Sequence, residues 1–193
     1  MKKMIVGIVL AGSVMTSPLA TADRQTVSLG YAHSKIQDMG NLNGVNLQYR
    51  YEWNSPLSII GSFSYMKGDD SDVYHDAAND SYKTRFKTKY YSLLAGPAYR
   101  INDYVSVYGL LGAAFTKTDG RYEWRNSVGA DAAVGHLTIE GSAHSTNLAW
   151  AAGVAINPID NLSVNIGYEG SRTELNGSDK SINGFNVGIG WRF

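Results

Sequence analysis

The chain has 193 residues, and its seventeen basic and seventeen acidic residues leave no net charge, so nothing in the composition suggests a nucleic-acid partner. It contains no cysteine, which excludes a disulfide framework and a thiolate metal site. There are 21 glycines and 13 tyrosines but no long helical pattern and no apolar run that could span a membrane as a helix, and this indicates an all-β fold.

The first 22 residues predict a cleaved export signal. Lys2 and Lys3 form a short basic region, residues 4–14 are apolar, and residues 20–22 offer small side chains for cleavage. The apolar run is shorter than the ~20 residues that a spanning helix needs. Cleavage leaves a mature chain of residues 23–193, with fifteen basic and seventeen acidic residues and a net charge of −2.

The rest of the chain alternates between apolar residues and small or polar ones with a period of two, as a β-strand with two different faces requires. The alternating segments are each about as long as the ~9–11 residues that a tilted strand needs to cross a bilayer. They are, in chain order, residues 27–34, 45–53, 57–65, 91–99, 105–117, 147–156, 162–169 and 182–193.

The second and the last segments alternate most clearly, whereas residues 105–117 are apolar on both faces, so their facing is left open. In the last segment, apolar residues ending in Phe193 alternate with glycine, asparagine and Arg192. Apolar residues outside and small or polar residues inside are what a barrel surrounded by lipid needs. The sequence therefore predicts an eight-stranded antiparallel transmembrane β-barrel of the outer-membrane type, with Phe193 as the recognition end for the barrel assembly machinery.

The connections alternate between short and long. Tight turns are expected at residues 54–56, 100–104 and 157–161, where Pro, Asn and Asp are frequent. Short turns of such barrels lie in the periplasm and long loops lie outside the cell, so both termini are expected to be periplasmic. The predicted extracellular loops are residues 35–43, 68–85, 118–143 and 173–181.

A soluble eight-stranded barrel of the lipocalin type is the alternative fold, with its apolar face inside. Two features oppose it. Aromatic residues gather near the strand ends of the apolar face, as membrane interfaces favour. The opposite face is rich in Gly, Ala and Ser, which suits the narrow interior of a small barrel.

Four charged residues are expected to point into this interior, namely Arg50, Glu52, Glu169 and Arg192. They could line an ion path. We favour a charge-compensated network of hydrogen bonds that fills the lumen, because buried charges need partners and the acids and bases are equal in number.

The long loops offer the accessible surface on which function can lie. The loop at residues 68–85 is rich in aspartate, and the loop at 118–143 mixes arginine with aromatic residues, a composition typical of protein-binding hot spots. The residues of this kind in the loop are Arg121, Tyr122, Trp124 and Arg125. Alternatively, Tyr122 and Trp124 extend the strands as a hairpin and serve only in packing.

Other basic residues lie where strands are expected to leave the membrane. Lys67, Lys87 and Lys89, with Lys117, are candidate contacts for lipopolysaccharide phosphates; alternatively, these side chains only snorkel or are solvated. Catalysis has little support, because the four histidines match no nucleophile or metal motif. We expect no catalytic residues, no cofactor and no metal.

The chain resembles the Ail/Lom/OmpX family of enterobacterial outer-membrane proteins, and most closely its PagC- and Rck-like members. The resemblance runs over the whole chain. Its carriers are residues 30–32 (GYA), 44–52 (GVNLQYRYE), 95–102 (AGPAYRIN), 157–158 (NP), 167–171 (GYEGS) and 184–193 (GFNVGIGWRF).

This resemblance implies an eight-stranded barrel whose extracellular loops, in the virulence-associated members, bind host matrix or complement regulators and promote attachment, invasion or serum resistance. The matching motifs lie in strands and short turns, so they transfer the fold and the location but no ligand. Basic and aromatic loop positions carry binding in some relatives, and the resemblance implies as candidate ligand contacts Lys117, Arg121, Tyr122, Trp124 and Arg125. The aspartates of residues 68–85 depart from a basic, heparin-binding surface. The rival hypotheses are a structural or envelope-stress barrel without a ligand and, as the least favoured, a lipid-modifying outer-membrane enzyme.

Overall fold

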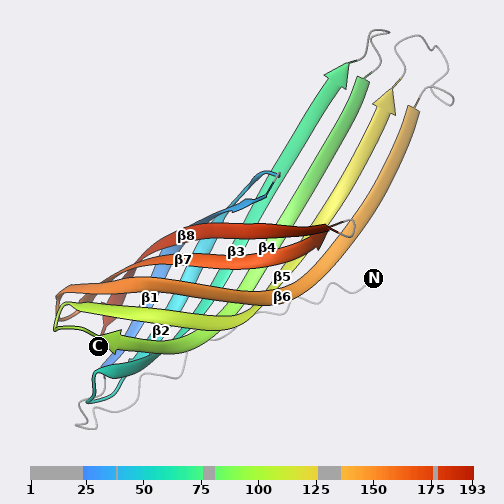
Figure 1. The fold of residues 1–193 in the computed structure, drawn as a ribbon. Coiled ribbons are helices and arrows are strands. Elements are labelled where there is room, and N and C mark those ends of the chain that lie inside the picture. Colours follow the sequence, from blue (N-terminus) through green and yellow to red (C-terminus); the bar gives the residue numbers. More distant parts are fainter. Residues whose placement is uncertain (1–23, 38, 76–80, 126–135, 176–177) are drawn as a thin grey trace, which may run out of the picture.

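The computed structural model describes residues 24–37, 39–75, 81–125, 136–175 and 178–193, and the predicted signal at 1–22 lies outside them. Eight strands form one closed antiparallel barrel in which each strand pairs with its neighbours in sequence and β8 pairs with β1 (Figure 1). The strands are β1 (Arg24–Ile36), β2 (Asn41–Glu52), β3 (Leu57–His75), β4 (Ser81–Arg100), β5 (Val105–Arg125), β6 (His136–Ile159), β7 (Leu162–Leu175) and β8 (Ser178–Arg192). Within these residues there is no helix long and apolar enough to cross a membrane. The predicted eight-stranded antiparallel barrel is confirmed.

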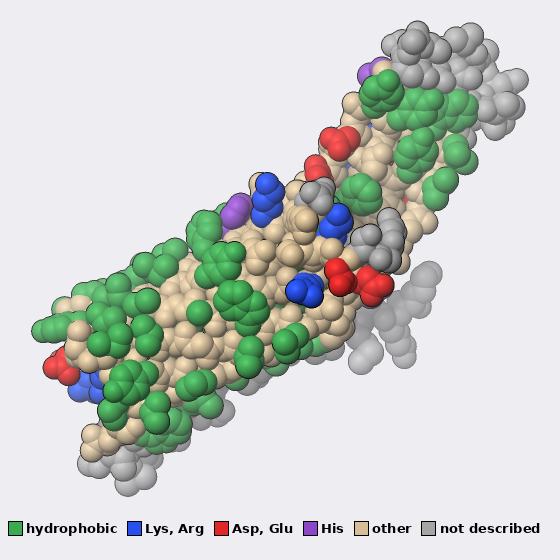
Figure 2. Space-filling model, in the orientation of Figure 1, with side chains coloured by type: hydrophobic (Ala, Val, Ile, Leu, Met, Phe, Trp, Pro, Cys, Tyr) green, Lys and Arg blue, Asp and Glu red, His purple; other side chains and the backbone are tan. Residues whose placement is uncertain are grey.

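The two sides of the barrel wall differ as the alternation predicts. Leu29 and Leu148, on the outside, are 62% and 73% exposed, whereas Ser28 and Ala149, their neighbours in sequence, are buried. Hydrophobic side chains cover the outside of the barrel in Figure 2. An exterior of this kind indicates contact with lipid, because contact of such a large apolar surface with water would be unfavourable in free energy.

Aromatic side chains on the outside contact one another near the two ends of the barrel wall. The rings of Tyr65 and Tyr91 stack with centroids 4.9 Å apart, and Tyr51 meets Trp53 edge-on at 5.4 Å. Such rings, apolar in body and polar at the tip, suit a membrane interface.

The structure settles the facing of β5. Tyr108 and Leu110 point into the barrel and are buried, while Leu111 and Phe115 lie outside and are exposed. The apolar residues on the inner side explain why the sequence pattern was ambiguous, because this part of the lumen is filled by apolar side chains.

All four long loops are shorter than expected, because their flanking strands continue. Residues 68–75 and 81–85 are strand, as are 118–125 and 136–143, and 173–175 and 178–181. The first loop likewise shortens, because β1 ends at Ile36 and β2 begins at Asn41. The predicted boundaries followed polar composition, but the pairing of backbone groups between two strands does not require apolar side chains.

These continuations build a sheet that stands beyond the barrel. Pairing of β2 with β3 reaches only Asn43 and Lys67, and pairing of β6 with β7 begins at Ala149 and Ser171. Beyond these limits, β3, β4, β5 and β6 pair only with one another (Figure 1). We call the part formed by residues 68–75, 81–88, 118–125 and 136–143 the projecting sheet.

Candidate functional site

The lumen is closed by paired charges at the end that carries the short turns. Glu52, which is 1% exposed, accepts hydrogen bonds from Arg192 at 2.9 and 3.2 Å and from Arg100 at 2.7 Å, and its Oε1 lies 3.1 Å from Arg50. Arg50 also donates to Ser58 and Ser106, each at 3.0 Å. One carboxylate thus holds three guanidinium groups in place.

The fourth charged residue expected in this network, Glu169, lies elsewhere in the lumen. Its carboxylate accepts hydrogen bonds from the Tyr90 hydroxyl at 2.7 Å and from Ser64 at 3.0 Å. The interior charges are therefore not one compensated set. Arg100, which the sequence analysis placed in a turn, is the third arginine at Glu52, and Glu169 is held by hydroxyl groups.

Apolar side chains close the other end of the lumen, next to the projecting sheet. Ile36, Leu42, Met66 and Ile182 are at most 2% exposed, and Met39 packs against this core. Charge pairs thus close the lumen at one end, and this apolar cluster, which we call the apolar plug, closes it at the other. Both sets of contacts join the strands of the barrel to one another. This arrangement favours a structural network over an ion path.

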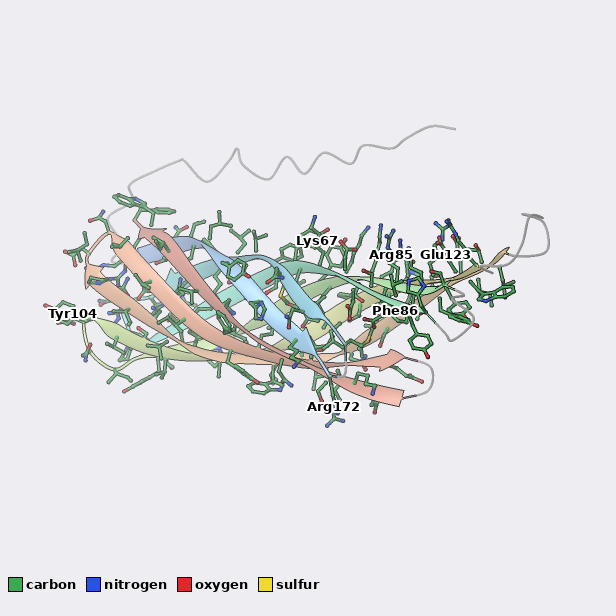
Figure 3. The ribbon with its side chains drawn as sticks, turned by 90° about the horizontal axis from the view of Figure 1, so that it is seen from above. Lys67, Arg85, Phe86, Tyr104, Glu123 and Arg172 are labelled. Atoms are coloured by element: carbon green, nitrogen blue, oxygen red, sulfur yellow. The ribbon has the colours of Figure 1, made fainter. Side chains whose placement is uncertain are left out.

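The projecting sheet has two different faces, because its strands continue the alternation of the barrel wall. One face continues the outside of the barrel, and we call it the outer face; the other continues the lumen side, and we call it the inner face. Arg85 and Phe86, neighbours on β4, lie on opposite sides of the sheet in Figure 3.

The outer face is basic. Together with the row of paired residues just below it, which contains Lys67, Lys89 and Lys117, it carries eight lysine and arginine side chains and four acidic ones among the side chains that the structure describes. The basic residues are Lys67, Lys83, Arg85, Lys87, Lys89, Lys117, Arg121 and Arg125. The acidic residues are Asp69, Asp119, Glu123 and Glu140.

Charged side chains on this face surround a hollow of about 420 Å³, lined by Arg85, Lys87 and Arg121 with Asp119 and Glu140. Arg121 Nε lies 2.8 Å from Glu123 Oε1 and 3.4 Å from Glu140 Oε1. These ion pairs are exposed, so they hold the side chains only weakly. The hollow therefore offers guanidinium and ammonium groups that can turn towards an anion.

The candidate lipopolysaccharide contacts lie together at the base of the outer face. Lys67 pairs with Lys89 in the strand register, Lys89 pairs with Lys117, and Lys117 pairs with His144. Lys87 is the next outward-facing residue of β4 in the direction of the projecting sheet. Three lysines, Lys67, Lys89 and Lys117, thus form a row across three strands, which the sequence alone could not show.

The inner face is aromatic and apolar. Tyr74, Tyr82, Trp124 and Leu137 occupy one rung across all four strands, where a rung is a set of residues paired across the sheet. The next two rungs towards the barrel are Asp72, Thr84, Tyr122 and Ile139, followed by Asp70, Phe86, Gly120 and Gly141.

The five candidate ligand contacts of the third loop consequently do not form one surface. Lys117, Arg121 and Arg125 lie on the outer face, whereas Tyr122 and Trp124 lie on the inner face. Treating residues 118–143 as a loop concealed this separation, because only a strand sends alternate residues to opposite sides. The aspartates of residues 68–75 are divided in the same way, with Asp69 outside and Asp70 and Asp72 inside.

The described part of the chain holds no group of three or more His, Asp or Glu residues placed to bind a metal ion. His33 Nδ1 lies 2.7 Å from the amide oxygen of Asn43, and its ring lies 5.5 Å from that of Phe185. These contacts place His33 in the wall of the barrel.

Comparison with known proteins agrees with this architecture. The family model for the enterobacterial Ail/Lom protein matches residues 1–193. The virulence membrane protein PagC of Salmonella typhimurium is 41% identical over 195 residues, which cover all of both chains. Outer membrane protein X of Enterobacter cloacae is 36% identical over 96% of this chain and 93% of its own length.

Solved structures give the same result. The crystal structure of Ail, the attachment invasion locus protein of Yersinia pestis, superposes with a TM-score of 0.65 at 31% identity, covering 88% of this chain and 98% of that one. A second crystal structure of that protein, in complex with the heparin analogue sucrose octasulfate, has a TM-score of 0.62 at 32% identity and covers 89% of this chain and 99% of that one.

Proposed function

We propose that this chain has a host-interaction function and that the projecting sheet carries it. The chain belongs to the enterobacterial Ail/Lom family and is an outer-membrane β-barrel. Relatives over nearly the whole chain are named for virulence and for attachment and invasion. In our proposal the barrel is a rigid support, without catalytic residues or a cofactor, and the sheet contacts matrix or complement-regulator proteins of the host.

The proposed orientation follows from the architecture. The projecting sheet and the longer connections lie outside the cell, and the short turns and both termini lie in the periplasm, as in bacterial outer-membrane barrels generally. Residues 1–22 are the cleaved signal. Phe193, which exchanges two backbone hydrogen bonds with Gln25 at 2.8 and 2.9 Å where β1 meets β8, is the end recognised by the barrel assembly machinery.

The observation that carries the proposal is the basic outer face. A barrel with only a structural role needs neither four strands that continue beyond the lumen nor eight basic side chains on one side of these strands. In this orientation the row of Lys67, Lys89 and Lys117 lies at the level of lipopolysaccharide phosphates and contacts them. Lys87 lies between this row and the hollow, and it borders both.

The upper part of the outer face would meet the host. Arg85, Lys87 and Arg121 around the hollow suit sulfate or carboxylate groups of a host glycan. The Ail protein of Yersinia pestis has been crystallised with the heparin analogue sucrose octasulfate, which supports the same ligand class here. Of the described aspartates that spoke against a polyanion, Asp70 and Asp72 lie on the inner face and Asp69 lies on the outer face beside Lys87, so the basic residues there outnumber the acidic ones.

The test compares two triple variants displayed by a serum-sensitive, non-adherent strain. The first replaces Arg85, Lys87 and Arg121 with serine. The matched control replaces Lys35, Arg172 and Lys180 with serine. These residues lie on β1, β7 and β8, so the control removes the same number of positive charges outside the projecting sheet. Surface amounts are equalised by heat-modifiability on gels.

We expect the first variant to lose most adhesion to wells coated with heparan sulfate and matrix protein, and the control to keep it. Equal adhesion of the intact protein and the first variant would contradict the assignment to the outer face. If the intact protein conferred neither adhesion nor serum survival, the structural-barrel hypothesis would replace the proposal.

A further inference from the structure

We propose that the inner face of the projecting sheet binds a short apolar segment of a second protein that carries lysine or arginine beside its apolar side chains. This inference rests on the host-interaction function proposed above, and it adds a second binding surface whose chemistry is opposite to that of the outer face.

The first observation is a compact apolar surface that has no function in the barrel. Tyr74, Leu137 and Ile139 are 66%, 48% and 56% exposed, and they stand beyond the apolar plug that closes the lumen. Figure 2 shows hydrophobic side chains on the projecting sheet, separated from the hydrophobic wall of the barrel by a band that contains charged side chains. Exposed apolar groups that serve neither lipid nor the core indicate a contact surface.

The second observation is the charge on this face. Its described side chains include two carboxylates, Asp70 and Asp72, and no lysine or arginine. Both aspartates belong to β3. Gly40, in the connection between β1 and β2, lies close to the Asp70 side chain, whereas Asp72 has no described strand beside it on that side. A segment bound across the aromatic residues would therefore meet acidic groups along one side, and basic residues there would complement them.

The size of the surface limits what can bind. Four strands ~4.8 Å apart and five residues along each, such as 70–74 on β3, at ~3.3 Å per residue, span roughly 14 by 13 Å between Cα atoms, or on the order of 400 Å² with side chains. A stable interface between folded proteins buries about 800 Å² on each partner. A single strand or a short helix fits this area, whereas a second copy of the chain would need a larger one.

The third observation is an open position within the surface. A Cβ atom added to Gly141 would meet no atom within 4 Å, and Gly120, its neighbour in the rung, lies beside the ring of Phe86. The Phe86 ring lies close to Gly120, so the space above Gly141, between this ring and the edge of the sheet, stays open. We call this space the lane. A side chain of the bound segment can enter this lane next to Ile139.

The test uses the full mature protein in phosphatidylcholine nanodiscs and three fluorescent twelve-residue peptides. These alternate leucine with lysine, leucine with glutamate, and serine with lysine. Binding is measured by fluorescence anisotropy, with subtraction of the signal from empty nanodiscs. We expect the leucine–lysine peptide to bind at least tenfold more tightly than the other two.

Three variants then test the surface itself. Leu137→Ser with Ile139→Ser removes exposed apolar groups, Asp70→Asn with Asp72→Asn removes the charge, and Gly141→Val fills the open lane without a clash. Each should weaken binding of the leucine–lysine peptide, and the first should do so at least tenfold. The matched control, Val73→Ser with Lys83→Ser, a cross-strand pair on the outer face, should stay within twofold of the intact protein.

Equal binding of the leucine–glutamate peptide, or full binding by the inner-face variants, would overturn the inference. So would competition by a neutral oligosaccharide such as maltoheptaose, which would assign the face to sugar. If no peptide binds while the outer-face variant still loses adhesion, the inference fails and the proposed function stands. If the intact protein neither binds peptide nor supports adhesion, both fail.

Discussion

Replacement of Glu52 by alanine should destabilise the barrel far more than loss of the charge on Glu169. Glu52 is the acidic partner in contact with three arginines, of which Arg50 and Arg192 are buried. Removing its carboxylate leaves those positive charges close together at the end of the lumen. The Glu169 carboxylate, by contrast, accepts hydrogen bonds from hydroxyl groups.

The magnitudes follow from these contacts. Breaking a buried ion pair by removing one partner costs ~3–5 kcal/mol, because the remaining charge is uncompensated. Changing Glu169 to glutamine keeps an oxygen that can accept from Tyr90, so the cost should be about 1 kcal/mol, the net contribution of one hydrogen bond. Glu174→Gln, an exposed change on the same strand, should stay within about 0.5 kcal/mol of the intact protein.

The assay is reversible urea unfolding in lipid vesicles, followed by tryptophan fluorescence and by the shift of the folded band on gels. We expect the free energy of unfolding to fall in the order Glu174→Gln, Glu169→Gln, Glu52→Ala. A cost below 1 kcal/mol for Glu52→Ala, or equal costs for Glu52→Ala and Glu169→Gln, would refute the view that Glu52 organises the arginines.

Three further predictions concern packing, the lumen and the membrane surface. Gly112→Ala should lower the unfolding free energy by ~1–3 kcal/mol, because its Cβ would clash with a carbonyl of β4, whereas Gly109→Ala faces open space and should be neutral in the same urea assay. Tyr90→Phe should cost ~1–3 kcal/mol, because a buried carboxylate loses its shortest hydrogen bond; an unchanged midpoint would contradict this. Lys89→Ser with Lys117→Ser should raise the sensitivity of cells to detergent by weakening contact with lipopolysaccharide, and unchanged sensitivity at equal surface amounts would count against that contact.

The strands could be predicted from the sequence because each one separates lipid from a narrow lumen. That difference forces alternation, as in residues 45–53, where the inward side chains Asn46, Gln48, Arg50 and Glu52 are all buried. Where the lumen itself is apolar, as at Tyr108 and Leu110, the alternation disappears and the facing of the strand could not be read.

The projecting sheet could be predicted only in part. The strand extension considered for Tyr122 and Trp124 is present, but the continuation of all four strands could not be read from a region that has no lipid on one side. Both of its faces include polar residues, so residues 118–125 and 136–143 read as loop. Composition drew attention to Arg121, Tyr122 and Trp124, but only the strand register shows that Arg121 and the two aromatic residues face opposite ways.

The role of Arg100 was missed for a related reason. It stands at the last position of β4, next to a turn, where a basic residue is expected to be solvated. A signal was available, because Glu52 also lies at the end of its strand and both ends meet at the same rim of the barrel. Counting charges at that rim, rather than along single strands, would have found it.

The most direct test of the central claim removes the projecting sheet and keeps the barrel. Lys67 pairs with Lys89 and Lys117 pairs with His144, so residues 68–88 and 118–143 can each be replaced by a two-residue Asn-Gly turn without a change of register. Serum survival and adhesion to matrix-coated wells are then compared at equal amounts of folded surface protein. We predict that the intact protein confers both properties and the shortened barrel confers neither; full adhesion and survival with the shortened barrel would show that the sheet is not the functional site.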